Sequence, residues 1–138
     1  MSDFNRRVID EFRANAGHVG ASFEDMPLLL LTSTGARSGR PHTTPLAYLE
    51  DDGRLVVFGS KGGAPTNPAW YYNLRANPDA TAEVGSERFP VRARITTGEE
   101  RERLFGRMKA LRPQFAEYEA KVRRTIPVVV LERALPGN

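Results

Sequence analysis

Two glycine-rich segments of the sequence carry basic side chains with no acidic residue beside them. The first, TSTGARSGRPHTTP, contains Arg37 and Arg40, and the second, FGSKGGAPTNPAW, contains Lys61. Glycine lets backbone N–H groups approach an anion closely, and the basic side chains supply charge. A single segment of this kind would favour a solvated turn, because Gly and Arg are common in turns. Since the pattern occurs twice, we interpret the segments as one anion site that binds a phosphate-bearing small molecule.

The distribution of charge argues for a small ligand over a polyanion. The chain has 20 basic and 17 acidic residues and a pI near 9.6. Between residues 26 and 78 the only acids are Glu50, Asp51 and Asp52, whereas basic and acidic residues alternate after residue 79. Such alternation is typical of solvated helices and not of a stripe that binds nucleic acid. We therefore expect no nucleic-acid partner.

Other kinds of site have little support in the sequence. The chain has no cysteine, and its two histidines, His18 and His42, lack the spacing of metal ligands, so no metal site is expected. The first loop lacks the spacing of a P-loop or of GxGxxG, and PHTTP after it does not start a helix comfortably. Ser60 lacks the first glycine of a GxSxG elbow, because Phe58 stands there.

The elements that must position these loops alternate between helices and strands. Asn67 is expected to cap a short helix, and Thr97 with Glu100 is expected to form a capping box. Short connections between consecutive strands predict a mainly antiparallel sheet, an α+β fold built as a small barrel with helices outside. The whole chain, 1–138, is expected to be one domain, with 1–25 as an N-terminal helix and lead-in. Helices are expected at 4–16, 68–76, 97–112 and 114–122, and strands at 28–33, 43–49, 55–60, 80–84, 89–96 and 126–131.

Location follows from what the sequence lacks. No apolar run approaches the roughly 20 residues that span a bilayer, and the N-terminus has no signal-peptide core, so we expect a cytoplasmic protein. The first helix could contact a membrane surface through Phe4, Val8 and Phe12, but we expect that face to pack on the barrel. The sequence predicts no oligomeric state.

A long stretch of the chain closely resembles the deazaflavin-dependent nitroreductase family, actinobacterial oxidoreductases that use coenzyme F420. The stretch is LLLLTSTGARSGRPHTTPLAYLEDDGRLVVFGSKGGAPTNPAWYYNLRANP, and with TIPVVVLE the resemblance covers nearly the whole chain after about residue 25. It implies a split β-barrel of the FMN-binding type. It also implies reduced coenzyme F420 as hydride donor, a 5-deazaflavin with a phosphate and an oligoglutamate tail. The protein would then supply binding, orientation and electrostatics.

The matching positions imply which residues bind this cofactor. Arg37 and Lys61 would hold the phosphate or tail together with Ala36 and Ser38. Relatives often have a basic residue at the position of Ala36, so binding of the tail would depend more heavily on Arg37 and Arg40. The positions implied along the ring and on its other side are His42, Thr43, Thr44, Pro45, Leu46, Ala47, Phe58, Gly59, Ser60, Gly62, Ala69, Trp70, Tyr71, Tyr72 and Asn73.

The resemblance also implies an electron-poor conjugated acceptor, such as a quinone, an enone or a nitroaromatic. Relatives that reduce nitroimidazoles carry several tyrosines in the C-terminal segment, where this chain has Arg112 and Phe115 and retains Tyr118. Ala47 likewise stands where a tyrosine can occur, beside the retained Tyr48. These departures predict a roomier pocket and favour a quinone or enone. Tyr48, Phe115 and Tyr118 are the candidate substrate residues.

Two hydroxyl groups are candidates for the catalytic role of holding or protonating the reduced acceptor, those of Tyr118 and Ser60. Tyr118 follows Phe115 at i+3, so it could equally pack one helix face. Two other functions remain open, an FMN-dependent oxidoreductase on the same fold and a protein that binds the deazaflavin without turnover.

Overall fold

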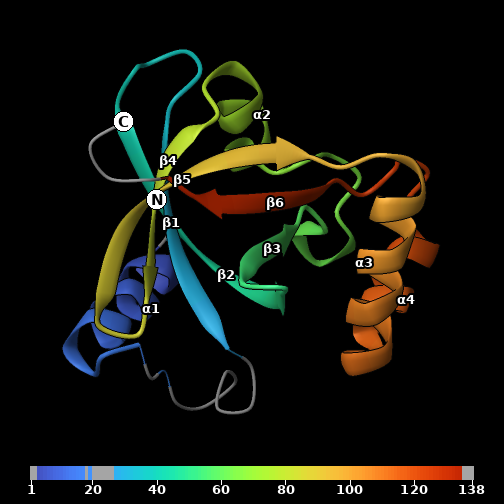
Figure 1. Ribbon diagram of the computed structural model, residues 1–138, viewed down its shortest axis with the longest axis horizontal. Coiled ribbons are helices and arrows are strands. Elements are labelled where there is room, and N and C mark those ends of the chain that lie inside the picture. The colour runs from blue at the N-terminus through green and yellow to red at the C-terminus, as the bar shows by residue number, and fades with distance from the viewer. Residues whose placement is uncertain (1–2, 18, 20–26, 135–138) are drawn as a thin grey trace.

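The computed structural model describes residues 3–17, 19 and 27–134, and within them the strands form one closed barrel. His18 and most of the lead-in before residue 25 lie outside the described residues. The barrel order is β1-β2-β3-β6-β5-β4, and every neighbouring pair is antiparallel (Figure 1). The expected α+β class, an antiparallel split barrel with peripheral helices, is confirmed. The strands are β1 Leu28–Thr34, β2 Pro41–Asp51, β3 Arg54–Phe58, β4 Asp79–Val84, β5 Glu87–Ile95 and β6 Val128–Arg133.

The run of four leucines in β1 is buried on both faces, which explains why it does not alternate. Leu29 and Leu31 pack inside the barrel, in a cluster that includes Val57 and Val129. Leu28 and Leu30 face outward and pack against α1, Asp3–Ala14. Strand β1 therefore joins the interior of the barrel to the N-terminal helix.

Helix α1 covers one side of the barrel. Val8, Ile9 and Phe12 are buried against β1, as expected for that face. Arg13 donates to both carboxylate oxygens of Glu83 on β4, at 3.1 and 2.9 Å. The packing role of Val8 and Phe12 is thus confirmed. Phe4 remains 58% exposed.

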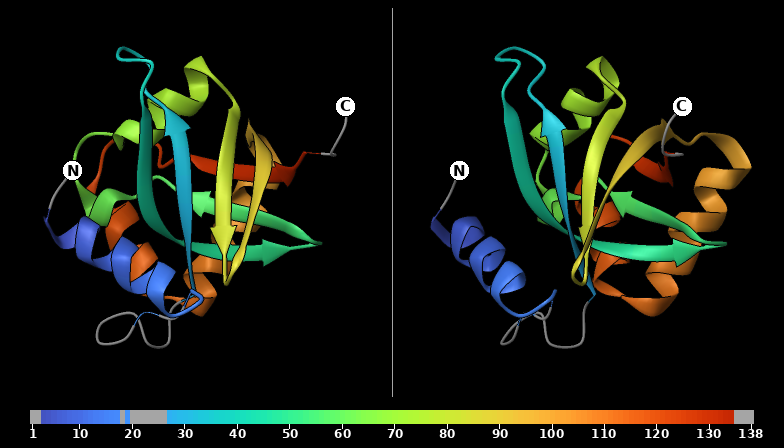
Figure 2. Two further views of the ribbon diagram at one scale, coloured as in Figure 1. Left: turned by 90° about the vertical axis from the view of Figure 1, so that its left-hand side faces the viewer. Right: turned by 60° about the vertical axis from the view of Figure 1, so that its left-hand side comes forward.

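The other helices cover the opposite side and one end of the barrel (Figures 1 and 2). Helices α3, Gly98–Leu111, and α4, Gln114–Lys121, bury Phe105 and Phe115 against Phe58. The short helix α2, Ala69–Ala76, inserts Trp70 and Leu74 into the interior cluster. In both views of Figure 2, α2 lies beside the β1–β2 loop at the same end of the barrel.

Both predicted helix caps are wrong. Helix α2 begins after Pro68 with no side-chain cap, because the amide of Asn67 bonds instead to Arg124 and Tyr72. Thr97 precedes α3 as expected, but its side chain makes no capping bond. The carboxylate of Glu100 accepts from Arg94 on β5, at 2.6 and 3.1 Å. In each case the side chain bonds to an arginine elsewhere in the fold and not to the backbone at the start of its own helix.

Several boundaries also differ from the expectation. Strand β2 starts at Pro41 because the β1–β2 hairpin is longer than the sequence indicated, and β6 starts at Val128. Helix α1 ends at Ala14, and the Gly17 N–H donates to the Phe12 carbonyl at 2.8 Å. The short 3-10 turn η2, Lys61–Gly63, was not expected.

Candidate active site

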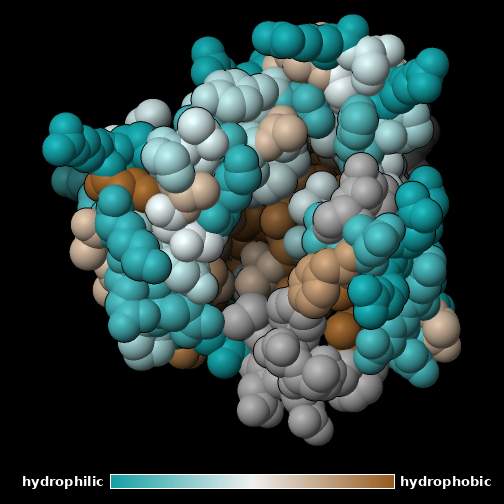
Figure 3. Space-filling view, turned by 180° about the vertical axis from the view of Figure 1, so that it is seen from behind, coloured by the Kyte–Doolittle hydropathy of each residue, from teal (hydrophilic) through white to brown (hydrophobic). Residues whose placement is uncertain are grey.

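A groove with two lobes lies between the barrel and the helical segments α1, η2, α2 and α4. The first lobe, called here the polar lobe, has a volume of about 680 Å³, and the second, the apolar lobe, about 540 Å³. Asn5, Thr44, Ala69 and Trp70 line both lobes, so the two lobes adjoin each other. Seen from behind, this face of the molecule is hollowed, with hydrophobic residues at the bottom of the hollow and a largely hydrophilic rim (Figure 3).

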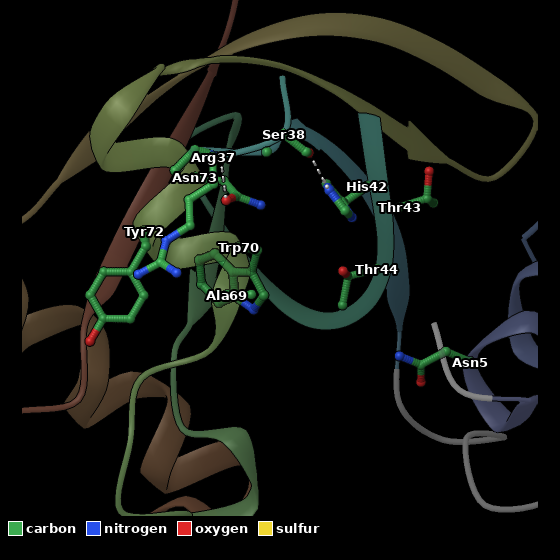
Figure 4. A pocket seen from close by; sticks show the side chains of 12 residues that line it. Asn5, Arg37, Ser38, His42, Thr43, Thr44, Ala69, Trp70, Tyr72 and Asn73 are labelled. Carbon is green, nitrogen blue, oxygen red and sulfur yellow. Dashed lines mark hydrogen bonds between the residues drawn. The ribbon is translucent and has the colours of Figure 1, made fainter. Parts of the chain in front are cut away.

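The β1–β2 loop, residues 35–40, forms the outer wall of the polar lobe. The Gly39 N–H donates to the Gly35 carbonyl at 2.9 Å, and the Gly35 N–H donates to the Arg40 carbonyl at 2.8 Å. Ser38 Oγ accepts from the Arg40 N–H at 3.1 Å and lies 3.3 Å from His42 Nε2 (Figure 4). A Cβ on Gly35 would lie only 2.5 Å from Ser38 Oγ and 2.8 Å from His42 Nε2, so a larger residue there would displace the side chains of Ser38 and His42.

The buried side chain of Asn73 attaches this loop to α2. Its Oδ1 accepts from the Ala36 N–H at 3.0 Å, and its Nδ2 donates to Ser33 Oγ at 3.2 Å. The loop is therefore held at its base while its tip is exposed. The guanidinium groups of Arg37 and Arg40 have no hydrogen-bond or ion-pair partner within the described ranges, and Arg37 lines the lobe (Figure 4).

The apolar lobe is floored by aromatic and aliphatic side chains from β2, β3 and α4. Phe58 and Phe115 meet edge to face, with ring centroids 5.8 Å apart. Ser60, which directly precedes η2, and Tyr118, from α4, also line this lobe. Neither hydroxyl has a hydrogen-bond partner among the residues that the structure describes. Two donors thus stand unpaired beside an apolar surface, an arrangement suited to a flat ligand that carries oxygen atoms.

Comparison with known proteins identifies the family. The model of the family described as F420H(2)-dependent quinone reductase matches residues 4–133. This chain belongs to that family. An F420H(2)-dependent quinone reductase of Mycobacterium tuberculosis is 37% identical to it over 128 residues, 88% of this chain and 85% of that protein. Its cofactor is accordingly reduced coenzyme F420, and the resemblance seen in the sequence is confirmed.

Solved structures agree with this assignment. An F420H2-dependent reductase, FDR-A, superposes with a TM-score of 0.71 at 40% identity and covers 77% of this chain and 94% of its own. A second structure, described as a domain-swapped dimer, superposes with a TM-score of 0.74 at 34% identity and covers 92% of this chain and 95% of its own.

The groove of this F420H2-dependent reductase fits a cofactor with an anionic tail. Within the described part of the chain, no Asp or Glu lines either lobe. Arg37 and His42 line the polar lobe, and Lys61 lines the apolar lobe, where its Nζ donates to Thr66 Oγ1 at 3.4 Å. An acid-free groove whose cations have no acidic partner within the described residues favours phosphate and carboxylate groups, while its apolar floor suits a flat ring.

The structure brings most of the sequence-predicted residues together at this groove. Lining residues among them are Ala36, Arg37, Ser38, His42, Thr43, Thr44, Pro45, Leu46, Ala47, Phe58, Ser60, Lys61, Gly62, Ala69, Trp70, Tyr72, Asn73, Phe115 and Tyr118. Arg40, Gly59, Tyr71 and Tyr48 line neither lobe.

Each of these four has another position in the structure. Arg40 is exposed at the end of the loop, and Gly59 lies against Pro127, whose carbonyl accepts its N–H at 2.9 Å. Tyr71 is half-buried and packs against the interior cluster. Tyr48 also packs there and lines two smaller cavities, and burial together with the charge of Glu50 raises the pKa of its hydroxyl.

Some lining residues were missed by the sequence interpretation. Phe4 and Asn5, at the start of α1, line the groove, but they precede the part of the chain that carries the resemblance. Gln114 lines the apolar lobe beside Phe115, in a segment where only the tyrosine positions drew attention. Arg112, by contrast, lines a separate cavity of about 240 Å³.

Proposed function

We propose that this protein uses reduced coenzyme F420 to reduce a quinone, with the cofactor lying along the two-lobed groove. The observation that carries the proposal concerns the described residues: no acid lines the polar lobe, and the apolar lobe contains two hydroxyls without a hydrogen-bond partner. The bound cofactor supplies a hydride from its ring. The relatives named as quinone reductases support the choice of acceptor.

In this proposal the polar lobe binds the acidic part of the cofactor. Arg37 supplies charge from the exposed loop, and Ser38 and His42 supply polar groups beside it. Because Asn73 holds the Ala36 N–H at the base of the loop, it restricts where these groups can point. The protein thus positions the cofactor, and it needs no nucleophile of its own.

The apolar lobe binds the acceptor and the ring. Phe58 and Phe115 exclude water from the flat surfaces, which strengthens every polar contact made there. The acceptor gains two electrons and one proton with the hydride, and its oxygen becomes an oxyanion that must be stabilised. We assign this role to the hydroxyls of Tyr118 and Ser60, since both line the lobe and neither has a partner among the residues that the structure describes.

Oxidation of the reduced cofactor by a quinone series tests the function. We expect the absorbance of oxidised coenzyme F420 to return only when protein and quinone are both present, and enones and nitroaromatics to react more slowly.

Titration of the apoprotein with coenzyme F420 and with FMN tests the first alternative, an FMN-dependent oxidoreductase, because we expect tighter binding of the cofactor with the longer acidic tail. Tight binding without oxidation by any acceptor would support the second alternative, a non-catalytic carrier.

Replacing Tyr118 by Phe is expected to lower turnover about tenfold, because it removes a donor to the developing oxyanion. The edge-to-face contact with Phe115, 5.3 Å between ring centroids, is kept in this variant. Cofactor affinity and thermal stability should therefore stay the same. Steady-state kinetics at saturating cofactor measure the effect, and unchanged turnover with every accepted quinone would leave Tyr118 a packing residue.

The location of the protein belongs to the same proposal. None of the helices in the described ranges is long and apolar enough to cross a membrane. A sequence without cysteine suits the reducing cytoplasm, where we place the protein. Phe4 is both exposed and part of the apolar lobe, so contact with a membrane surface would occur at the acceptor side of the groove. Sedimentation with lipid vesicles, wild type against Phe4→Ser, tests that contact.

A further inference from the structure

Arg124, in the connection between α4 and β6, uses its whole guanidinium group on neutral acceptors. Nε donates to the Ala64 carbonyl at 3.2 Å, and Nη2 donates to the carbonyls of Ala64 and Ser60, both at 3.0 Å. Nη1 donates to the Gly59 carbonyl at 3.0 Å and to Asn67 Oδ1 at 2.6 Å. No carboxylate within the described ranges pairs with it, and burial lowers the pKa of its guanidinium.

These bonds hold the Ser60–Ala64 turn, which contains η2. The turn has few bonds of its own, from the Gly63 N–H to the Ser60 carbonyl at 2.9 Å and from the Ala64 N–H to the Lys61 carbonyl at 3.1 Å. Lys61 is a non-glycine residue with positive φ, 49°, which costs free energy without outside support. Arg124 supplies that support, because it binds carbonyls at both ends of the turn.

The same turn packs closely on α4. A Cβ on Gly63 would lie 3.0 Å from Lys121 Cδ and 3.6 Å from Tyr118 Cα. Ser60 on the turn and Tyr118 on the helix line the same lobe. The distance between these two hydroxyls therefore depends on how the turn is seated against α4.

Asn67 extends the arrangement to the other lobe. Its Oδ1 accepts from Arg124, and its Nδ2 donates to the Tyr72 hydroxyl at 3.4 Å. Tyr72 lines the polar lobe. Arg124 thus connects the wall of the apolar lobe, at Ser60, to the wall of the polar lobe, at Tyr72.

We infer that Arg124 is a positioning residue, which fixes the Ser60–Ala64 turn between α4 and α2 so that cofactor and acceptor meet at the correct distance. The inference rests on the proposed function. Misplacement of reacting groups by about 1 Å can lower a rate about 100-fold, so a residue that touches neither ligand can control turnover. Arg124 lines neither lobe, and it acts through the backbone of Ser60.

Arg124→Lys separates geometry from charge, because it keeps the cation and loses the planar fork. We expect kcat at saturating cofactor to fall at least about tenfold, and the Kd for coenzyme F420 to change less than about threefold. Arg124→Gln, which also loses the charge, should lower kcat further. The matched control is the neighbouring Arg123, which is exposed: Arg123→Lys and Arg123→Gln should leave both constants unchanged.

Hydrogen–deuterium exchange provides a readout that does not depend on turnover. We expect the amides of residues 59–67 to exchange faster in Arg124→Lys, with α1 unchanged. Unchanged exchange at 59–67 in both Arg124 variants would overturn the inference, and so would faster exchange with wild-type kcat. A wild type that fails to reduce any quinone would refute the proposed function alone, since the exchange result still decides whether Arg124 holds the turn.

A further variant covers the case in which Arg124→Gln does not fold. Asn67→Ala removes one acceptor and leaves Arg124 in place, so exchange at 59–67 and kcat should shift in the same direction by a smaller factor. An Asn67→Ala protein indistinguishable from wild type in both measurements would count against the coupling between lobes.

Discussion

Replacing Asp51 by Asn is expected to lower the free energy of unfolding by about 2–3 kcal/mol, the largest stability effect that we predict for a polar residue. Asp51 is 6% exposed at the end of β2. Its carboxylate accepts from Arg54 Nη2 at 3.0 Å, from Arg103 at 3.0 and 3.1 Å, and from Arg107. Arg103 and Arg107 belong to α3, so this one carboxylate joins the β2–β3 hairpin to the helix.

The size of the effect follows from the exposure of the partners. A fully buried ion pair costs about 3–5 kcal/mol to break when one partner is removed. Here the side chains of Arg103 and Arg107 are 52% and 45% exposed, so water takes over part of their solvation in the variant. Asn also keeps one acceptor oxygen. Both facts place the expected loss below the fully buried limit.

The pH dependence of the effect has a defined sign. The hydrogen bond from Arg103, followed by that from Arg54, holds the pKa of Asp51 well below its ordinary value, although burial opposes the shift. A depressed carboxylate pKa means that the unfolded chain binds the proton first as pH falls. The stabilisation is therefore fully present above the ordinary pKa of about 4 and is lost as pH falls below it.

Denaturant unfolding of wild type and Asp51→Asn from pH 3 to pH 8 measures the loss of unfolding free energy and its dependence on pH. The difference between the two proteins should be constant above about pH 5 and shrink below about pH 4. Asp52→Asn is the matched control, because Asp52 is exposed, adjacent and in a left-handed conformation that Asn tolerates. An equal loss in both variants would mean that net charge, and not the contacts of Asp51, sets the stability.

The sequence predicts well what depends on local pattern. The four leucines of β1 indicated a buried strand because such a run has no polar residue to place in water, and the structure buries it on both faces. The acid-free glycine loops indicated an anion site, and both loops contribute to a groove that no carboxylate of the described residues lines. The absence of helix-starting residues after the first loop excluded a nucleotide-binding α/β fold, and the structure continues there as β2.

Side-chain contacts with residues far away in the sequence could not be predicted from local pattern. Asn67 and Glu100 have the residue types of helix caps, but the barrel places Arg124 and Arg94 within reach, and charge-assisted bonds to these partners replace the capping bonds. Arg124 is one of two adjacent arginines in the sequence, and only the fold distinguishes this half-buried arginine from its exposed neighbour. Asn5 reaches the groove because α1 packs across β1, which no local signal encodes.

Replacing Arg37 by Ala is expected to weaken the binding of coenzyme F420 by about one to two orders of magnitude. A charge-assisted hydrogen bond contributes about 1.5–3 kcal/mol, and each 1.4 kcal/mol is about a factor of ten in Kd. Arg37 meets the conditions for this role, because its guanidinium lines the polar lobe and has no competing partner within the described ranges. Turnover at saturating cofactor should change little, since Arg37 lies in the other lobe from Tyr118.

Lys61→Ala should have a smaller effect on the same titration, about tenfold or less, because its ammonium is exposed and already donates to Thr66. Arg37→Lys should recover part of the affinity, since a lysine keeps the charge but not the bidentate geometry.

The effect of Arg37→Ala on Kd, compared at different salt concentrations and with different ligands, distinguishes a specific contact from a general loss of positive charge. Because the loop tip is exposed, the difference in Kd between wild type and Arg37→Ala should shrink as ionic strength rises. FMN carries a phosphate without the acidic tail, so Arg37→Ala should weaken FMN binding less than it weakens the binding of coenzyme F420.

Arg88→Ala is the control, as Arg88 is an exposed arginine on β5 that lines neither lobe. If Arg88→Ala weakened binding as much, the positive charge of the whole protein would attract the cofactor and the loop would have no specific role. A collapse of turnover at saturating cofactor with unchanged Kd would instead place Arg37 beside the reacting atoms, which its position in the polar lobe opposes.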